Sequence, residues 1–334
     1  MLAGIYNATN GSIPLAGVSL NWGATSIQAW SGPAACASCG GCPPCYNGWL
    51  PPGPTHPGNA SVLHNAMLLP FQGPAAAARF PAAGAMWYQG EDNAMAAQAD
   101  YYACALRALV EEWRTLLASP ALWFGVVQLA PWVSTVALNE PVAALRQAQA
   151  QASIGAGAPA GVSLITAADG GDPSAPQVIH PRSKALPGGR LARAALAALY
   201  GRNDLAAQGP IYASAAAAPP GPAGRLSVTV SFQTAPPAPG HDFSSYCPTE
   251  VGVPADNCAW FAVQASDGLW RNASAALVAP PGGGPPAQLT LTIDTAPASG
   301  LTAVATSAGY GLWPVLSLRN VAGFPALPWN FNVM

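Results

Sequence analysis

Charged side chains are scarce in this chain of 334 residues. They make up 8% of the sequence, and Lys184 is its only lysine. The 12 lysine and arginine residues against 14 aspartate and glutamate residues leave a formal net charge of −2 at pH 7. Proteins that bind nucleic acids neutralise phosphates with clustered lysine and arginine. The composition therefore offers no electrostatic basis for a nucleic-acid partner.

Long hydrophobic runs are lacking as well. Hydrophobic residues form 51% of the sequence, but no stretch approaches the roughly 18 uninterrupted apolar residues that a membrane-spanning helix needs. We therefore expect no membrane span. The opening residues, from Met1 to Asn10, also lack the basic segment and the apolar core of a signal peptide.

Cysteines, in contrast, are clustered. Four of the seven form a C-x-x-C-x-x-C-x-x-C run: Cys36, Cys39, Cys42 and Cys45. The bacterial iron–sulfur run ends with a longer gap followed by Cys-Pro, and a zinc finger needs a histidine pair or a second cysteine pair at its own spacing. Neither pattern is present, so we expect disulfide bonds in an oxidising compartment rather than a metal site. The other cysteines are Cys104, Cys247 and Cys258.

Glycosylation sequons accompany the cysteines. Asn-x-Ser/Thr triplets begin at Asn7, Asn10, Asn59 and Asn272, and each is a glycan acceptor if the chain enters the secretory path. Together with the cysteines they predict a glycoprotein that is secreted or resides in lysosomes or other endomembranes. Because no signal peptide opens the chain and the odd cysteine count leaves one thiol unpaired, we expect a fragment whose true N-terminus lies upstream.

The sequence predicts two domains joined by a linker. Residues 1–205 alternate apolar runs with helical patterns, which is typical of an α/β domain with a mostly parallel sheet, and include a Cys/Pro-rich loop at 33–58. Residues 206–224 have the Ala/Pro/Gly composition of a linker. Residues 225–334 predict a small all-β, sandwich-like domain. The expected strands are 13–20, 85–88, 122–129, 162–166, 226–232, 260–265, 288–293 and 301–306, and the expected helices are 98–117, 142–152 and 188–200.

Three polar loops follow expected strands of the first domain, at residues 21–25, 89–93 and 169–180. Open α/β sheets place their sites at the carboxyl ends of strands. The first two loops combine glycine N–H groups with amide side chains, and an oxyanion hole needs such fixed neutral donors. The candidate donors are Gly23, Gln89, Gly90 and Asn93.

The third loop carries His180 with two aspartates upstream, Asp169 and Asp172. A histidine next to a carboxylate forms the base-and-orienter pair of an acyl-transfer site. The ordinary alternative is a surface turn, because Asp-Pro and His-Pro dipeptides are common in loops. The other histidines are interpreted as solvated loop residues, His56 and His241, and as a structural residue, His64.

Residues 87–93, Trp-Tyr-Gln-Gly-Glu-Asp-Asn, closely resemble the W-Y-Q-G-E-x-N signature of the sialate O-acetylesterase family, within the SGNH/GDSL hydrolases. The resemblance runs from about residue 12 to the end of the chain and implies an SGNH-like three-layer domain with a mostly parallel sheet. Further blocks resemble the family in the same order, at residues 21–31, 61–67, 169–173, 179–184 and 313–326.

The resemblance implies an esterase that removes O-acetyl groups from sugars. A serine would attack the acetyl carbonyl, His180 would take its proton, and Asp172, or Asp169 as the alternative, would orient the imidazole. The serine N–H, the Gly23 N–H and an amide of the 89–93 loop would hold the oxyanion. This chemistry needs neither a metal nor an organic cofactor. The implied partner is an O-acetylated carbohydrate substrate, and the oligomeric state stays open.

The sequence departs from the family pattern at the nucleophile. The family's G-Q-S-N-M block has no counterpart upstream of residues 21–25, and Ser12 and Ser19 lack the strand-turn-helix context of a nucleophile. Ala24 replaces the second glycine of the family's W-G-G-T, and Gln177 stands where the superfamily often has its aspartate. We therefore predict an esterase whose first strand and nucleophile are missing from this chain, which as given is inactive.

Two other interpretations stay open. A catalytically inactive, sugar-binding relative of the same fold would keep an aromatic-lined cleft built from Trp22, Trp87, Tyr88 and Trp132. Retention of the base and of the amide residues argues against it. The second alternative is a metal or redox module on the four-cysteine run, which the cysteine spacing disfavours.

Overall fold

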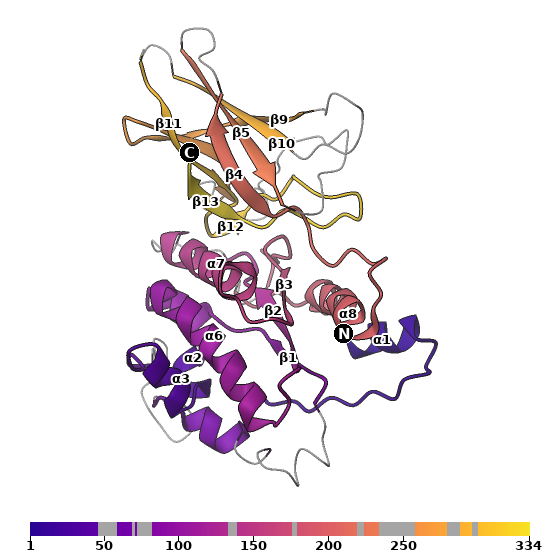
Figure 1. The fold of residues 1–334 in the computed structure, drawn as a ribbon. Helices are drawn as coiled ribbons and strands as arrows, with labels where there is room; N and C mark the ends of the chain where they lie inside the picture. The colour runs from indigo at the N-terminus through magenta and orange to yellow at the C-terminus, as the bar shows by residue number, and fades with distance from the viewer. Residues whose placement is uncertain are drawn as a thin grey trace. The chain divides into compact units, whose positions relative to one another are not determined.

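The protein, described here from a computed structural model, divides into two compact units (Figure 1). The first contains residues 1–129, 141–167 and 183–205. The second contains residues 130–140, 168–182 and 206–334, so two interior segments group with the C-terminal part of the chain. The structure describes residues 1–45, 59–68, 71, 82–132, 139–175, 179–218, 224–233, 258–278, 288–295 and 300–334.

A parallel three-stranded sheet forms the centre of the first unit. Its strands β1 (Gly84–Trp87), β2 (Trp123–Gln128) and β3 (Val162–Thr166) lie in the order β1-β2-β3. Every residue of β2 is buried, as expected of a parallel strand covered on both faces. The prediction of an α/β part with a parallel sheet is confirmed. The described helices are α1 (Leu2–Ala8), α2 (Ile27–Trp30), α3 (Pro33–Ser38), α5 (Glu91–Met95), α6 (Ala99–Leu116), α7 (Asn139–Ile154) and α8 (Ala185–Tyr200), with a π-helical turn at His64–Leu68.

Helices cover both faces of this sheet (Figure 1). Phe124 of β2 packs against Trp113 of α6 with ring centroids 5.5 Å apart. The next residue, Gly125, faces the other way, where an added Cβ would come 2.7 Å from Leu191 Cδ2 of α8. Because successive strand residues point to opposite faces, α6 and α8 lie on opposite sides of the sheet. The first unit therefore has three layers.

The strand expected at residues 13–20 is not formed, and that prediction is wrong. No helix or strand lies between residues 12 and 26, and Val18 is 62% exposed. Within the described part of the chain β1 pairs with β2 alone, so no strand lies beside residues 13–20. An apolar run becomes a strand only when a neighbour satisfies its backbone N–H and C=O groups. Residues 13–20 are exposed or half-buried, so these groups are open to water.

Two four-stranded antiparallel sheets share the core of the second unit. One has the order β4-β5-β10-β9 and the other the order β13-β11-β7-β8. Burial alternates along β7 and β10, which sends every second side chain into a common core containing Val228, Val263, Leu291 and Trp329. The prediction of an all-β C-terminal part is confirmed. The strands are β4 (Tyr212–Ala217), β5 (Arg225–Phe232), β6 (Cys258–Ala259), β7 (Phe261–Ala265), β8 (Trp270–Asn272), β9 (Ser274–Val278), β10 (Gln288–Asp294), β11 (Ala303–Ala308), β12 (Trp313–Pro314) and β13 (Trp329–Asn332).

Two elements lie in stretches that were expected to be irregular. Strand β4 lies within residues 206–224, where the sequence predicts a linker; it pairs with β5, and its Ala215 is fully buried. Helix α3 lies within the 33–58 loop and begins with Pro33 in its first turn. Alanine has a low strand propensity, so the composition gave no signal for β4. Burial in the sandwich core decides its conformation.

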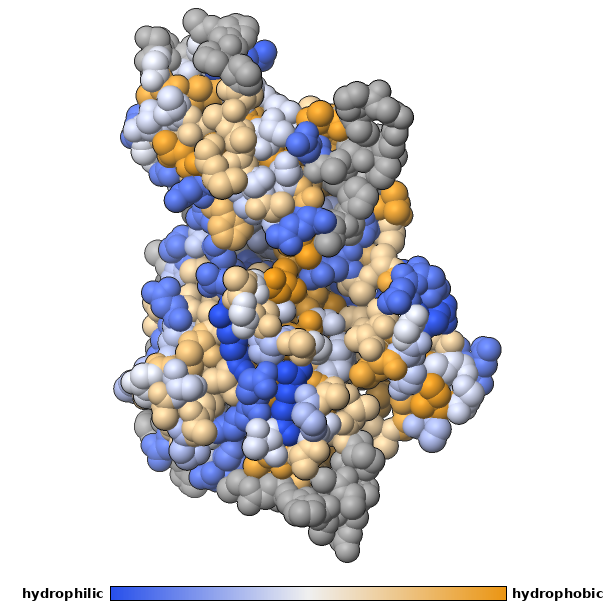
Figure 2. Space-filling model, viewed as in Figure 1, coloured by the Kyte–Doolittle hydropathy of each residue, from blue (hydrophilic) through white to orange (hydrophobic). Residues whose placement is uncertain are grey.

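The surface is mixed in polarity. On the face shown in Figure 2, hydrophilic and hydrophobic residues are interspersed, consistent with a chain in which 8% of residues are charged. In the described segments, no helix combines the length and the apolar character that crossing a bilayer requires.

Candidate active site

The loop after β1 begins with a turn that requires glycine. Gly90 is the N-cap of α5 and has a φ of +146°, a conformation that favours glycine. An added Cβ would come 2.5 Å from Leu145 Cδ2 and 3.2 Å from Gln149 Nε2. The turn brings two predicted site residues together, because Gln89 Nε2 donates a hydrogen bond to Asn93 Oδ1 at 2.9 Å.

Asn93 is fully buried and uses its whole side chain in hydrogen bonds. Its Nδ2 donates to Gln28 Oε1 at 2.8 Å and to Gln98 Oε1 at 2.9 Å. Its Oδ1 accepts from the Ile27 N–H at 2.9 Å, in addition to the bond from Gln89. The amide therefore fastens the start of α2 to the loop that follows β1.

The side-chain amide of Gln89 is also fully used in hydrogen bonds within the protein. Its Nε2 donates to Thr25 O and to Asn93 Oδ1, both at 2.9 Å, and its Oε1 lies 3.0 Å from the Tyr102 hydroxyl. Both predicted amide donors thus spend their N–H groups inside the protein. Gly23, in contrast, is exposed, and its N–H makes no hydrogen bond to any described residue. It is the predicted donor that stays accessible to a substrate oxygen.

The turn that presents Gly23 contains a strained residue. Ala24 has a φ of +53°, a left-handed conformation that costs a non-glycine residue roughly 1–2 kcal/mol. Glycine would adopt this conformation without that cost. Thr25 anchors the turn, since its Oγ1 donates to Trp22 O at 2.9 Å and accepts from Trp30 Nε1 at 3.0 Å.

Polar side chains on α6 and α7 support the loop from within the core. Tyr102 accepts a hydrogen bond from Trp87 Nε1 and donates to Gln89 O, both at 3.0 Å. Gln149 Nε2 also donates to Gln89 O at 3.0 Å, and its Oε1 accepts the Leu129 N–H at 3.1 Å. Neither Tyr102 nor Gln149 was predicted from the sequence to support the site. The sequence feature that could have indicated them is a polar group on the buried face of an otherwise apolar helix.

Two neighbouring carboxyl groups on α5 titrate close to neutral pH. Burial raises the pKa of Glu91 to about 7 and the pKa of Asp92 to about 6. The positive charge of Lys184 opposes the rise at Glu91. Lys184 Nζ itself lies 5.7 Å from the centre of the Tyr88 ring. The sequence motif alone does not reveal these shifts, because they arise from surroundings supplied by other segments.

The histidine loop belongs to the second unit. His180 is exposed. Asp172 accepts hydrogen bonds from Arg182 Nε at 2.8 Å, from Arg182 Nη2 at 3.2 Å and from Ser174 Oγ at 2.8 Å. The Arg182 guanidinium, followed by Ser174, holds the pKa of Asp172 well below its usual range, so this carboxylate stays ionised. Among the described residues, none of its hydrogen bonds goes to His180.

Asp169, the alternative acid, is also held by an arginine. Its Oδ2 lies 3.1 Å from Arg319 Nη2, and its side chain is 9% exposed. This ion pair ties the histidine loop to the C-terminal segment of the same unit. Four residues singled out from the sequence lie outside the described residues: His56, Gln177, His241 and Cys247.

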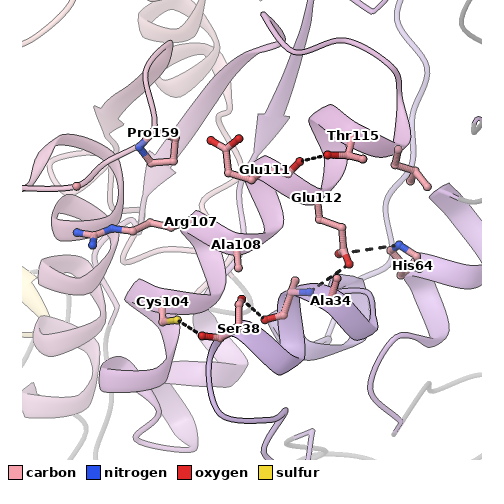
Figure 3. Close-up of a pocket in the computed structure, with 13 residues that line it drawn as sticks. Ala34, Ser38, His64, Cys104, Arg107, Ala108, Glu111, Glu112, Thr115 and Pro159 are labelled. Carbon is pink, nitrogen blue, oxygen red and sulfur yellow. Dashed lines mark hydrogen bonds and ion pairs between the residues drawn. The ribbon is translucent and has the colours of Figure 1, made fainter.

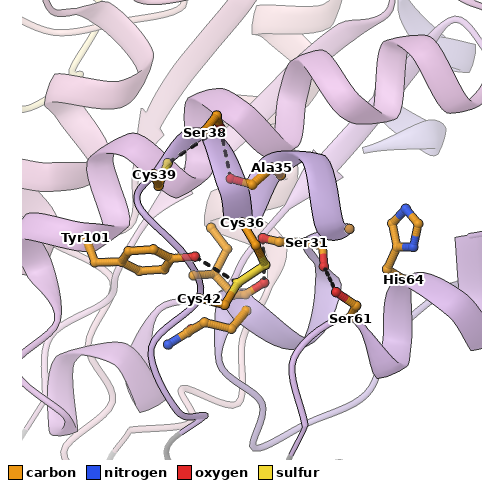
Figure 4. The surroundings of a disulfide bond; sticks show 12 residues. Ser31, Ala35, Cys36, Ser38, Cys39, Cys42, Ser61, His64 and Tyr101 are labelled. Atoms are coloured by element: carbon orange, nitrogen blue, oxygen red, sulfur yellow. Dashed lines mark hydrogen bonds between the residues drawn. A yellow bond between two sulfur atoms is a disulfide. The ribbon is translucent and has the colours of Figure 1, made fainter.

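Three cysteines of the four-cysteine run form disulfides, and Figure 4 shows the surroundings of the one between Cys36 and Cys42. Cys36 pairs with Cys42, and Cys39 pairs with Cys104 of α6, so the disulfide prediction is confirmed. Cys45 is a free thiol whose pKa is raised to about 11, chiefly by burial. In the described part of the chain no group of three or more His, Cys, Asp or Glu side chains could hold a metal.

A separate cleft of about 1260 Å³ opens beside α3 and α6 (Figure 3). His64 Nε2 lies 3.9 Å from Glu112 Oε2, and both side chains are largely buried. Glu112 accepts the N–H groups of Gly32 at 2.6 Å and of Ala35 at 3.2 Å, at the start of α3. The carboxylate therefore caps α3, and the predicted site residues do not line this cleft.

The aromatic residues of the 87–93 block have structural neighbours. Trp87 is 5% exposed and packs edge to face against Trp30 and Trp113, with ring centroids 6.0 and 5.7 Å away. Trp132 is 6% exposed, whereas Trp22 is 41% exposed. The aromatic-lined cleft expected of a sugar-binding relative is therefore not built from Trp87 or Trp132.

Residues 8–196 match the profile of the family described as carbohydrate esterase, sialic acid-specific acetylesterase, which is more than half of the chain. The chain belongs to this family. The resemblance found in the sequence motifs is thereby confirmed. Human sialate O-acetylesterase is 31% identical over 209 residues, which cover 59% of this chain and 38% of the human protein. The rat sialate O-acetylesterase is 29% identical over 235 residues, covering 59% of this chain and 42% of the rat protein.

This member of the sialic acid-specific acetylesterase family thus spans less than half the length of the curated relatives it matches. The crystal structure of a carbohydrate acetylesterase from Xanthomonas citri has a similar fold, with a TM-score of 0.66 and 23% sequence identity. The similarity covers 94% of this chain and 60% of that one. This similarity supports the fold assigned to the chain and does not identify a substrate.

Proposed function

We propose that the protein is a carbohydrate O-acetylesterase of the sialate type, which hydrolyses acetyl esters on sugars by serine–histidine–aspartate chemistry. The family match over residues 8–196 supports this reaction. The observation that carries the proposal is the bond from Gln89 to Thr25 O, backed by Asn93, because it anchors the turn that leaves the Gly23 N–H exposed.

The proposed roles follow from these contacts. Gly23 donates its N–H to the oxyanion, while Gln89 and Asn93 hold the turn in place. His180 takes the proton of the attacking serine and returns it to the departing sugar oxygen, and water then releases acetate. The ionised carboxylate of Asp172 is proposed to orient His180. To do so, Asp172 must give up part of its ion pair with Arg182. Asp169 is the alternative for this role.

We further propose that the nucleophilic serine belongs to a segment outside this sequence, because the 334 residues contain no G-Q-S-N-M block. Ser12 Oγ donates to Thr9 O at 2.6 Å, and Ser19 Oγ contacts the Asn21 side chain. Both serines are exposed and lie outside any strand-turn-helix. The chain by itself is then inactive. The two disulfides support a secreted, lysosomal or other endomembrane location.

Two chains test the proposal: the chain as given, and one extended upstream with the in-frame serine block of its transcript. Both are assayed with 4-nitrophenyl acetate and with O-acetylated sialic acid. The extended chain should lose at least about 10³-fold in kcat when His180 is replaced by alanine, and the short chain should match its own His180→Ala variant. His180-dependent turnover by the short chain refutes the missing nucleophile. An extended chain that is folded but inactive on every acetylated sugar refutes the esterase.

A catalytically inactive sugar-binding relative is the second candidate. It is favoured by one observation, namely that the amide N–H groups of Gln89 and Asn93 are all used within the protein. Calorimetric titration of the extended chain with an O-acetylated sugar separates the two candidates. Binding without release of acetate identifies the relative, whereas release of acetate identifies the esterase.

A further inference from the structure

The β7–β8 hairpin of the second unit presents an exposed aromatic ring beside a glycosylation sequon. Trp270 is 42% exposed, and Asn272, the first residue of the 272–274 sequon, is exposed too. They stand two residues apart on β8, so their side chains project from one face, about 7 Å apart along the strand. Arg271 between them pairs with Val263, which is fully buried. The strand face that carries Trp270 and Asn272 therefore points away from the core.

The residues next to Asn272 across the sheet are small. The cross-strand partner of Asn272 is Ala262, and Ser307 of β11 lies opposite Ala262 on the next strand. Both are small side chains. Gln264 lies opposite Trp270 and donates its side-chain amide to a carbonyl of the hairpin turn at 3.0 Å. The indole N–H of Trp270 has no hydrogen-bond partner among the described residues.

An aromatic residue two positions before the acceptor distinguishes this sequon from the others. The corresponding residues are Ile5 before Asn7, Ala8 before Asn10 and Pro57 before Asn59. The face of an aromatic ring carries partial negative charge, and the C–H groups of a pyranose ring, which are slightly positive, pack favourably on it. A sugar attached at Asn272 would therefore find a preformed contact on the same strand face.

We propose that Asn272 carries an N-linked glycan whose first sugar ring stacks on the indole of Trp270. In the transfer, Asn272 Nδ2 attacks the anomeric carbon of a lipid-linked oligosaccharyl diphosphate. A carbon–nitrogen bond forms, the bond from that carbon to the diphosphate oxygen breaks, and the amide proton leaves with the diphosphate. The disulfides of the first unit are compatible with an oxidising compartment, which is where eukaryotic cells attach such glycans. The proposal does not rest on the esterase function.

The first experiment measures occupancy. The full chain is expressed in a eukaryotic secretory host, and N-glycans are released in heavy-oxygen water, which leaves a labelled aspartate at each occupied site. We expect the label at residue 272 and its loss in the Ser274→Ala variant. Because transfer precedes folding, intracellular chain is analysed together with secreted chain, so poor secretion still gives an answer. An unlabelled residue 272 in chain that is labelled at other sequons overturns the proposal.

The second experiment tests the stacking with a double-mutant cycle. Trp270→Ala should lower the Tm of the glycosylated chain by about 2–4 °C and leave the Asn272→Gln chain nearly unchanged. Leu269→Ala is the matched control, since it removes an apolar side chain that is 60% exposed one position away; it should affect both backgrounds equally. Equal effects of Trp270→Ala in both backgrounds overturn the stacking. Trp270-dependent binding of a free chito-oligosaccharide by the Asn272→Gln chain overturns it as well, because the ring would then serve a soluble ligand.

Discussion

Replacing Asn93 by alanine tests whether its side-chain amide stabilises the fold or binds the substrate. The side chain makes four hydrogen bonds, to Gln28, Gln98, Gln89 and the Ile27 N–H. Alanine removes all of them and leaves their partners in a buried site. Each lost bond typically lowers stability by about 0.5–1.5 kcal/mol. We therefore expect the free energy of unfolding of the first unit to fall by roughly 2–6 kcal/mol.

Urea unfolding followed by tryptophan fluorescence measures this change, because Trp30 and Trp87 form an edge-to-face pair next to the loop, with ring centroids 6.0 Å apart. Asn203→Ala is the matched control: Asn203 is exposed in the same unit and should change stability by less than about 0.5 kcal/mol. Equal urea midpoints for Asn93→Ala and Asn203→Ala would refute the structural role. The amide would then be free to act as an oxyanion donor.

Gly90→Ala should lower the free energy of unfolding by about 2–4 kcal/mol through backbone strain and overlap with a neighbouring leucine. Gly189→Ala, where nothing lies within 4 Å of the added Cβ, should raise it by about 1 kcal/mol because alanine is the better helix former; similar calorimetric shifts for both would contradict the assigned strain. Removing the disulfide between Cys39 and Cys104, a sequence separation of 65, by a double serine substitution should lower the free energy of unfolding by about 4 kcal/mol. Urea titration checks this, and a loss below about 1 kcal/mol would count against it. Burial raises the Glu91 pKa from 4.5 to about 7, so the folded state binds more protons than the unfolded state within that window, and stability should fall as the pH rises through it. Glu91→Gln should reduce this slope in a series of Tm values against pH, and an unchanged slope would show that Glu91 is not its source.

Local periodicity was enough to predict several elements. The strand expected at 162–166 is β3, with the same bounds, and the helix expected at 98–117 is α6, Ala99–Leu116. In each case the spacing of apolar residues matches a single regular element that is buried on at least one face. Such a pattern is a property of adjacent residues and does not depend on the partner segment.

The spacing of apolar residues does not predict which distant segments pair with each other. Residues 13–20 are apolar enough for a strand, but no strand of the described residues lies beside them. The alanine-rich β4, in contrast, becomes a strand because β5 pairs with it and the sandwich core buries Ala215. The partners of the clustered cysteines are a further case. The run indicated disulfides, but only the packing of α3 against α6 brings Cys39 to Cys104.

The sequence by itself determined the family, the three polar loops and the chemical groups they offer, because these reside in short contiguous motifs. The tertiary structure decided what each group does. The partners of Asn93 include Ile27 and Gln28, which are 66 and 65 residues away in sequence. Because the Asn93 amide hydrogen-bonds to such partners, it is not available to a substrate, although the sequence motif suggested that it would be. Gly23 keeps its N–H accessible because no comparable partner reaches it among the described residues. A hydrogen-bonding group serves either the fold or the substrate, and only the three-dimensional arrangement of its neighbours settles which.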